Sequence, residues 1–342
     1  MDHFINPTTE VSRLINEKAG LLYEKLTRLQ VDQLGMPEAC LIYFKGSHFT
    51  RLFFSIQTSA HLLNRALQHS GKKPEELCVM DYGAGVGTLY SLAKMIGCKV
   101  VYNDHLEDWK KSAQLIAEAI GVQVDHYVVG DIDTTLDYLD QHQIKVDVIL
   151  SRNVVEHIYS LKSFFELIDK RAPDAIIISS TTANFNNPAS RWKHARWHKK
   201  WEPAYLALRK KFIQDQFPQL SEGVWSHLAV ATRGMSYTDI KSSVEAFIQN
   251  KTVPDPSIHR TNTCDPEYGV WAEHIIPFSE YRTFIPQRYQ VLFAAGFWDT
   301  HYRSVLKRLL GKAMNALQGI VPVFATHLAP FIYIEAIPKK EK

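Results

Sequence analysis

A glycine-rich segment preceded by an acid is the strongest chemical signal in the chain. It reads Asp81-Tyr82-Gly83-Ala84-Gly85-Val86-Gly87-Thr88, follows a short apolar run and opens a helical pattern. Glycines permit a tight turn and let the atoms of a ligand approach the backbone closely. In parallel sheets, ligands bind where such a turn follows the carboxyl end of a strand. The segment therefore predicts a ligand site at this turn, with a purely structural turn as the alternative.

Three more polar residues stand where later strands are expected to end. Asp104 ends one apolar run, Asp131 follows another, and Asn153 lies in the loop after a further one. A carboxylate such as that of Asp104 can accept two hydroxyl hydrogen bonds at once. The alternative for Asp104 and Asp131 is that each caps the following helix, and Asn153 could be an ordinary turn residue.

The spacing of apolar residues predicts the elements that position these groups. Helical spacing over 9–34 and 49–69 predicts two N-terminal helices. From residue 77 to residue 180, strand and helix patterns alternate, which predicts a parallel, doubly wound sheet. The expected strands cover 77–81, 99–104, 125–131, 146–151 and 175–180, and the expected helices cover 88–96, 109–120, 135–141 and 161–170.

The alternation stops after the fifth expected strand. Residues 184–288 are aromatic, basic and helix-rich. Beyond them, Arg288–Ala295 is predicted as a helix, and Ser304–Leu317 is predicted as a basic helix. Phe297–Arg303 and Phe331–Ile337 are predicted as strands.

The order of these segments resembles that of class I S-adenosylmethionine-dependent methyltransferases, including the small-molecule and ubiquinone-biosynthesis-type members. The resemblance covers roughly residues 74–182 and the last strands near 290–337. It implies an α/β fold with a seven-stranded, mostly parallel, Rossmann-like sheet, N-terminal helices and a large helical insertion after the fifth strand. It also implies S-adenosylmethionine as the cofactor. The implied division is 1–73 as an N-terminal helical segment, 74–183 as the cofactor-binding core, 184–288 as an acceptor-binding lid and 289–342 as the C-terminal part of the core.

The resemblance also implies roles for single residues. Asp104 would accept hydrogen bonds from both ribose hydroxyls, Asp131 would contact the adenine amino group, and Ile132 would pack on the purine. Ser151 to Asn153 would lie beside the methionine part of the cofactor. The implied cofactor-binding set is Asp81, Gly83, Ala84, Gly85, Gly87, Asp104, Asp131, Ile132 and Asn153.

Methyl transfer from a sulfonium needs alignment above all, and a base only where the acceptor must lose a proton. The candidate catalytic residues are His157, Glu273 and His274. Some quinone and phenol O-methyltransferases carry a Glu-His pair similar to Glu156-His157, with another Glu three residues earlier, and bind a divalent metal. Here that earlier position is Asn153, so we expect no metal. The alternatives are an ordinary loop histidine at 157, and a helix cap or packed histidine at 273–274.

The insertion supplies the candidate acceptor-binding residues Arg191, Arg196 and Trp271. Arginine can hold an anionic group with two parallel hydrogen bonds. The alternative is a solvated basic face whose tryptophans pack on the main domain. His194 and His198 have metal-ligand spacing, but their basic neighbours favour a solvated face. Six aromatic residues could wall an organic acceptor, with half or more expected in the core: Trp192, Trp197, Trp201, Tyr205, Trp225 and Trp271.

Composition narrows the acceptor class. The formal net charge of +3 gives no global case for nucleic acid, so we expect a small-molecule acceptor. The alternatives are a methyltransferase of RNA or protein, a non-catalytic S-adenosylmethionine-binding protein, and an NAD(P) oxidoreductase, which the GxGxG pattern in place of GxGxxG disfavours. The four scattered cysteines and the absence of a secretory signal favour the reducing cytoplasm. The apolar runs are too short to span a bilayer.

Overall fold

A seven-stranded sheet forms the centre of the molecule. The computed structural model describes residues 3–255 and 261–339. The strands are β1 Cys78–Tyr82, β2 Lys99–Asp104, β3 His126–Val129, β4 Val148–Arg152, β5 Ile176–Thr181, β8 Tyr289–Ala295 and β9 Ile332–Pro338. Their order is β3-β2-β1-β4-β5-β9-β8, with β9 antiparallel to both of its neighbours and the other pairs parallel. The predicted α/β, doubly wound sheet is confirmed.

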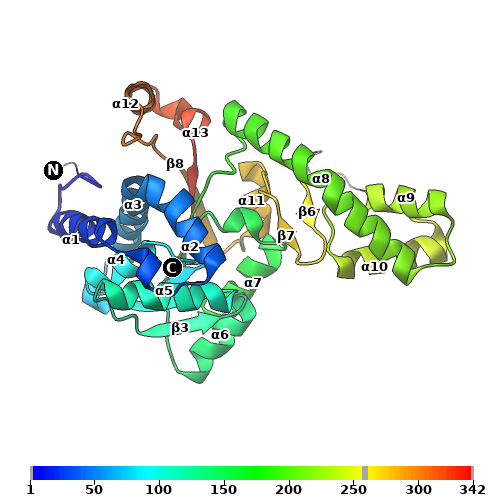
Figure 1. The fold of residues 1–342 in the computed structure, drawn as a ribbon, viewed down its shortest axis with the longest axis horizontal. Helices are drawn as coiled ribbons and strands as arrows, with labels where there is room; N and C mark the ends of the chain where they lie inside the picture. The colour runs from blue at the N-terminus through cyan, green and yellow to red at the C-terminus, as the bar shows by residue number, and fades with distance from the viewer. Residues whose placement is uncertain (1–2, 256–260, 340–342) are drawn as a thin grey trace.

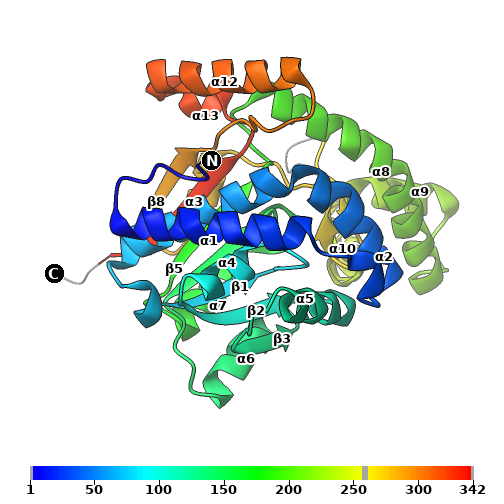
Figure 2. The ribbon, with the colours of Figure 1, turned by 60° about the vertical axis from the view of Figure 1, so that its left-hand side comes forward.

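Helices cover both faces of this sheet (Figures 1 and 2). They are α1 Glu10–Thr27, α2 Glu38–Tyr43, α3 Leu52–Ser70, α4 Leu89–Met95, α5 Glu107–Ala119, α6 Ile132–Gln141, α7 Leu161–Arg171 and α11 Phe278–Phe284. Successive strand residues point to opposite faces. Val79 therefore joins the core under α1, α3, α4 and α5, while Met80 joins the core under α6, α7 and α11. Short helical segments are η1 Val31–Gln33, η2 Phe44–His48, η3 Phe49–Arg51, η4 Pro74–Glu76, η5 Val155–His157 and η6 Pro322–Phe324.

The insertion after β5 is an arm of three helices that projects from the sheet (Figure 1). These helices are α8 Pro188–Gln216, α9 Glu222–Ala231 and α10 Tyr237–Asn250. The arm has a small core of its own, which includes Ile213, Leu228 and Ile240. A two-stranded sheet that the sequence analysis missed follows the arm, formed by β6 Cys264–Asp265 and β7 Val270–Trp271.

Two predicted elements near the C-terminus are wrong. Arg288–Ala295 is not a helix, because its residues pair in register with β9 and form the edge strand β8. Phe297–Arg303 is not a strand, since the backbone of Trp298 bonds instead to the Asn315 side chain. The predicted basic helix is confirmed as α12 Val305–Ile320, and α13 Ala325–Leu328 follows it. Within 3–255 and 261–339, none of the helices combines the length and apolar character needed to traverse a bilayer.

Candidate functional site

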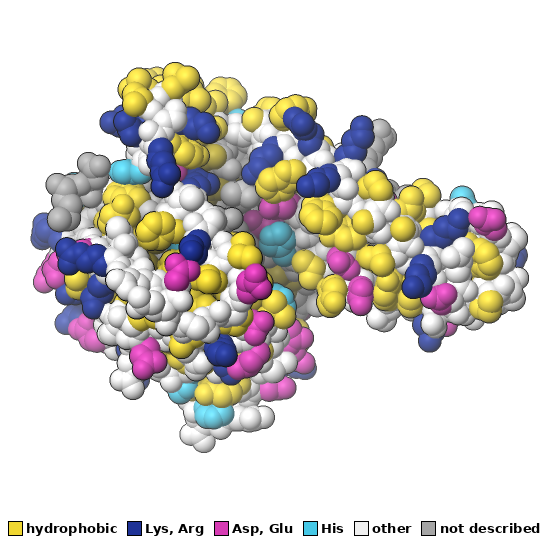
Figure 3. Space-filling view, viewed as in Figure 1, with side chains coloured by type: hydrophobic (Ala, Val, Ile, Leu, Met, Phe, Trp, Pro, Cys, Tyr) yellow, Lys and Arg dark blue, Asp and Glu magenta, His cyan; other side chains and the backbone are white. Residues whose placement is uncertain are grey.

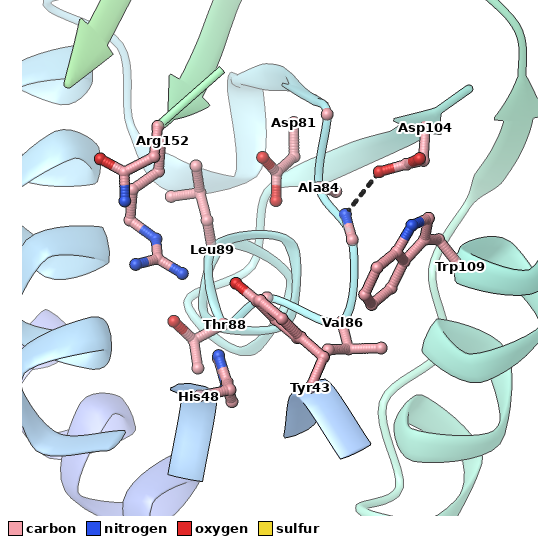
Figure 4. Close-up of a pocket in the computed structure, with 14 residues that line it drawn as sticks. Tyr43, His48, Asp81, Ala84, Val86, Thr88, Leu89, Asp104, Trp109 and Arg152 are labelled. Carbon is pink, nitrogen blue, oxygen red and sulfur yellow. Dashed lines mark hydrogen bonds between the residues drawn. The ribbon is translucent and has the colours of Figure 1, made fainter. Parts of the chain in front are cut away.

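A cavity of about 200 Å³ lies at the carboxyl ends of β1, β2 and β4 (Figure 4). The chain leaves β1 through the turn 83–88 and enters α4, so the backbone of this turn forms one wall. Asp104 comes from the end of β2, and Arg152 from the end of β4. The strands that follow β1 are added first on one side of it, as β2 and β3, and then on the other side, as β4 and β5. Doubly wound folds bind ligands in the crevice where the strand order reverses in this way.

Packing explains why two positions of the turn are glycine. Gly83 has a φ of +67°, and a Cβ added there would lie 2.6 Å from Cγ2 of Val154. A Cβ added at Gly87 would lie 2.7 Å from the carbonyl oxygen of Ala84. A larger residue at either position would push the turn away from its support. The glycines thus fix the shape of the cavity wall.

Asp104 joins this turn to the edge of β2. Its Oδ2 accepts a hydrogen bond from the Gly85 N–H at 2.9 Å, drawn as the dashed line in Figure 4. Its Oδ1 accepts one from the Leu106 N–H at 3.2 Å. A carboxylate offers about four lone-pair sites, so Asp104 keeps capacity for a ligand hydroxyl.

Asp81 is buried beneath the turn and lines the same cavity. Its Oδ2 accepts a hydrogen bond from the Tyr90 N–H at 2.9 Å. Burial raises the pKa of Asp81 to about 7, although this hydrogen bond and the positive charge of Arg152 act in the opposite direction. The carboxyl group therefore exchanges its proton near neutral pH, and a cationic ligand would favour its ionised form.

Three side chains that the sequence analysis missed also line the cavity: Tyr43 of α2, His48 of η2 and Trp109 of α5. The rings of Tyr43 and Trp109 meet edge to face with centroids 5.2 Å apart. Burial, reinforced by the charge of Arg152, lowers the pKa of His48 to about 3, so this imidazole is neutral. No motif marks positions 43 and 48. For Trp109, the sequence offered one signal, which is an aromatic side chain at the start of the helix expected after Asp104.

A second cavity, of about 330 Å³, adjoins the first. The two share Tyr43, His48, Arg152 and Asn153 as lining residues. The second cavity also reaches Arg51 and Phe54, Ser180 and Thr182 at the end of β5, Trp197 of α8, and Phe331. The N-terminal helices thus supply much of its wall, and α8 supplies one residue.

Three polar groups that line the two cavities have no hydrogen-bond or ion-pair partner in the described part of the chain. No hydrogen bond or ion pair reaches the guanidinium of Arg152, which extends into the first cavity from the side opposite Asp104 (Figure 4). His48 Nε2 and Ser180 Oγ are buried and likewise have no hydrogen-bond partner there. Unsatisfied buried polar groups are costly, so their convergence on a cavity indicates a polar ligand.

The other predicted cofactor residues fall into two groups. Ala84 and Asn153 line the first cavity, and Asn153 has a φ of +57°. Asp131 and Ile132 do not line it. Asp131 caps α6 by accepting a hydrogen bond from the Thr134 N–H at 2.9 Å, and Ile132 is buried in the core. The capping alternative for Asp131 is confirmed, and its contact with adenine stays a prediction.

The candidate bases lie together although they are far apart in the sequence. His157 Nδ1 is 2.8 Å from the Trp271 carbonyl oxygen, and the His274 N–H donates to the Glu156 carbonyl at 2.7 Å. Neither histidine lines the two cavities. Glu273 lies nearer, with its Oε2 3.5 Å from Oγ1 of Thr182 in the wall of the second cavity.

His194 and His198 contradict the expected solvated face, because both are fully buried. They lie on the inner stripe of α8 together with Ser190, spaced four residues apart, while the lysines and arginines around them point outward. His194 Nε2 lies 3.3 Å from the Glu273 carboxylate. His198 Nε2 lies 2.8 Å from the Glu273 carbonyl oxygen.

The predicted acceptor contacts lie away from the two cavities. The guanidinium groups of Arg191 and Arg196 lie over the rings of Phe185 and Trp192, on the outer side of α8. Trp271 is buried and stacks on His274 at 4.0 Å. The alternative, in which the tryptophans of α8 pack on the main domain, is wrong for Trp192 and Trp201, which are exposed. Trp197 is also partly exposed, but it lines the second cavity.

Comparisons with known proteins identify the family of the chain. The family model described as "Methyltransferase domain" matches residues 53–241, which is more than half of the chain. A search of curated proteins finds no match. Among solved structures, a mutant of MtNAS in complex with S-adenosylmethionine is 19% identical, with a TM-score of 0.33 and coverage of 50% of this chain and 59% of that one. A ribosomal protein methylase from Lactobacillus delbrueckii subsp. bulgaricus is 22% identical, with a TM-score of 0.29 and coverage of 37% and 60%. The matched region thus spans less than two thirds of either protein.

Proposed function

This chain belongs to the methyltransferase-domain family, whose members use S-adenosylmethionine, and we propose that it transfers the methyl group to a small anionic acceptor. The observation that carries this proposal is the pair of adjoining cavities with common walls at the carboxyl edge of the sheet. One cavity contains the glycine turn and two acids, and Arg152, whose guanidinium has no protein partner in the described part of the chain, borders both cavities.

The first cavity fits the cofactor. Asp104 keeps acceptor capacity for the ribose hydroxyls, and the Trp109 ring offers a flat apolar surface beside it. Asp81 would face the positive charge of the cofactor. S-adenosylmethionine supplies a methyl group on a sulfonium, activated for in-line displacement. The protein's part is to bind, orient and keep water out.

The second cavity would hold the acceptor. Arg152 would donate to a carboxylate or phosphate oxygen, since a guanidinium forms two parallel hydrogen bonds with such groups. His48 and Ser180 offer further polar contacts, and Phe54, Trp197 and Phe331 offer apolar ones. An acceptor anchored in this way would present an oxygen or nitrogen toward the shared wall.

A proton could leave the acceptor through a short series of side chains beside this cavity. Thr182 lines it, and its hydroxyl lies 3.5 Å from the Glu273 carboxylate, which in turn lies 3.3 Å from His194. We infer that Glu273 receives the acceptor's proton, directly or through Thr182. The Glu273 side chain reaches the wall of the second cavity through this contact with Thr182.

Two measurements test the proposal. Calorimetry with S-adenosylhomocysteine tests the first cavity, and no binding would overturn the cofactor assignment. Transfer of a labelled methyl group into extract separated by anion exchange tests the second cavity. We expect the label in small anionic compounds, and label confined to neutral compounds, RNA or protein would refute the acceptor class.

A further inference from the structure

Helix α12 turns its polar side toward the protein. Gly311 is buried, and a Cβ added there would collide with the carbonyl oxygen of Asp299. Asn315 lies on the same side, and its side chain bonds to the backbone N–H and carbonyl of Trp298 at 2.7 and 3.0 Å. The Arg308 guanidinium reaches the Tyr302 carbonyl oxygen. A surface helix normally buries its apolar side, so α12 is inverted.

The apolar side of α12 faces solvent as one continuous stripe. Leu306 is 77% exposed and Ile320 is 76% exposed, at opposite ends of the helix. With the exposed Ala313 included, exposed apolar residues recur between them at spacings of three and four, which places them on one face. The segment after the helix extends the stripe. The exposed members are Val305, Leu306, Leu309, Leu310, Leu317, Ile320, Val323 and Phe324.

Cations border this stripe on both sides. At about 3.6 residues per turn, Lys307 and Lys312 fall on opposite flanks, between the apolar face and the face packed on the protein. Residues 300–334 contain four lysines or arginines and no acid. An amphipathic helix with this arrangement matches those that lie in the surface of an anionic membrane.

The first turns of α8 extend the same side of the molecule. In Figures 1 and 2 they lie beside α12 and α13, and the Asn187 side chain bonds to the Ala329 carbonyl oxygen just after α13. Trp192 is 64% exposed there, and residues 175–201 contain no acid. Figure 3 shows hydrophobic side chains with lysines and arginines among them over both elements. Tryptophan is enriched at membrane surfaces.

We propose that the α12 stripe, together with the start of α8, binds the surface of an anionic phospholipid bilayer. A second copy of the chain is the less suitable occupant. A symmetric dimer would bring each patch against itself, and Lys307 and Lys312 would then face the same cations of the other copy. Anionic lipid supplies the opposite charge, and the lysine stems can reach it while the leucines enter the acyl boundary. This inference does not depend on methyl transfer.

Co-sedimentation of the full-length protein with vesicles tests the proposal. One set is phosphatidylcholine alone, and the other replaces about a third of it with phosphatidylglycerol. We expect strong binding to the second set, weaker binding to the first, and release at high salt. Equal binding to both sets, or to neither, would overturn the proposal.

Matched variants locate the bound surface. Leu306→Glu combined with Leu309→Glu, and separately Lys307→Gln combined with Lys312→Gln, are each expected to reduce partitioning about tenfold or more. Control substitutions on the distal arm are Val230→Glu, at a side chain that is 57% exposed on α9, and Lys241→Gln on α10. Binding that survives the α12 variants, or falls equally in the controls, refutes the assignment. Gel filtration of the parent chain showing a dimer that the leucine variant abolishes would identify self-association instead.

Discussion

The Glu273 carboxylate lies 3.3 Å from Nε2 of the fully buried His194. Burial disfavours the charge of Glu273, but the neighbouring His194 imidazole outweighs the effect of burial and lowers the pKa of this carboxyl group. A carboxylate with a lowered pKa stays ionised throughout the neutral range. Beside Thr182, it is therefore in the correct state to receive a proton from the second cavity.

Replacing Glu273 with glutamine is expected to lower kcat by about 10²–10⁴-fold, because the base is lost. The affinity for S-adenosylhomocysteine should stay unchanged. Glu245→Gln, at an exposed position on α10, is the control. In His194→Asn the pKa of Glu273 should rise, which moves the acidic limb of the pH–kcat profile to higher pH. Full activity of Glu273→Gln across pH would exclude Glu273 as the base.

Asp104→Asn is expected to weaken binding of S-adenosylhomocysteine by roughly 1.5–3 kcal/mol, since a charge-assisted acceptor becomes a neutral one. Calorimetry measures this loss. Asp108→Asn, on the exposed start of α5, changes a nearby acid outside the cavity and should bind normally. Parent-like affinity in Asp104→Asn would remove this residue from the cofactor site.

Cofactor binding is expected to strengthen as pH rises through the pKa of Asp81, which burial raises to about 7. The cationic cofactor binds the ionised carboxyl group, so affinity should increase between about pH 6 and about pH 8, with release of a proton on binding. Asp81→Asn should flatten this dependence. Burial also raises the pKa of Glu156 to about 7, but Glu156 lies outside the cavity lining, and Glu156→Gln should retain the dependence.

Arg152→Gln is expected to raise the KM of an anionic acceptor by about tenfold or more, through loss of a charge-assisted pair. The Kd of S-adenosylhomocysteine should change little. Arg191→Gln combined with Arg196→Gln is the control, because these residues lie outside both cavities. If Arg152→Gln weakens the cofactor alone, the guanidinium binds the cofactor carboxylate instead.

Gly83→Ala is expected to destabilise the protein by more than Gly71→Ala. Both glycines have nearly the same φ, +67° and +65°, so both alanines carry the cost of a left-handed backbone, about 1–2 kcal/mol. At Gly71 no atom lies within 4 Å of an added Cβ, whereas at Gly83 it would meet Val154. Chemical denaturation should show a larger loss for Gly83→Ala, and Val154→Ala should recover part of it. Equal losses would mean that the turn moves freely away from Val154.

Local sequence patterns predicted the parts of the fold that local forces determine. The range of β2 was predicted as Lys99–Asp104 and observed with the same bounds, because a buried parallel strand is a short apolar run between turn signals. The edge strand β8 was mistaken for a helix, because its pairing partner β9 is remote in sequence. Seven residues are too few for periodicity to separate the two structures.

The residues of the candidate site could likewise be predicted only where the local sequence marks the end of a strand. Asp81, Gly83 and Asp104 were found because each stands at a strand end, where the chain itself marks the edge of the sheet. Tyr43 and His48 reach the cavity through the packing of the N-terminal helices, which no local pattern encodes. The burial of His194 depends on which side of α8 faces the sheet, and the charged neighbours concealed it.

The common walls of the two cavities have a consequence for inhibitor design. Because Tyr43, His48, Arg152 and Asn153 border both cavities, a compound bound in either cavity would lie against the same four residues. In a compound that links an adenosine-like part to an anionic head group, binding of one part would hold the other at a high effective concentration near its own cavity. Such a bisubstrate compound would bind more tightly than either part alone, provided that the linker fits the span.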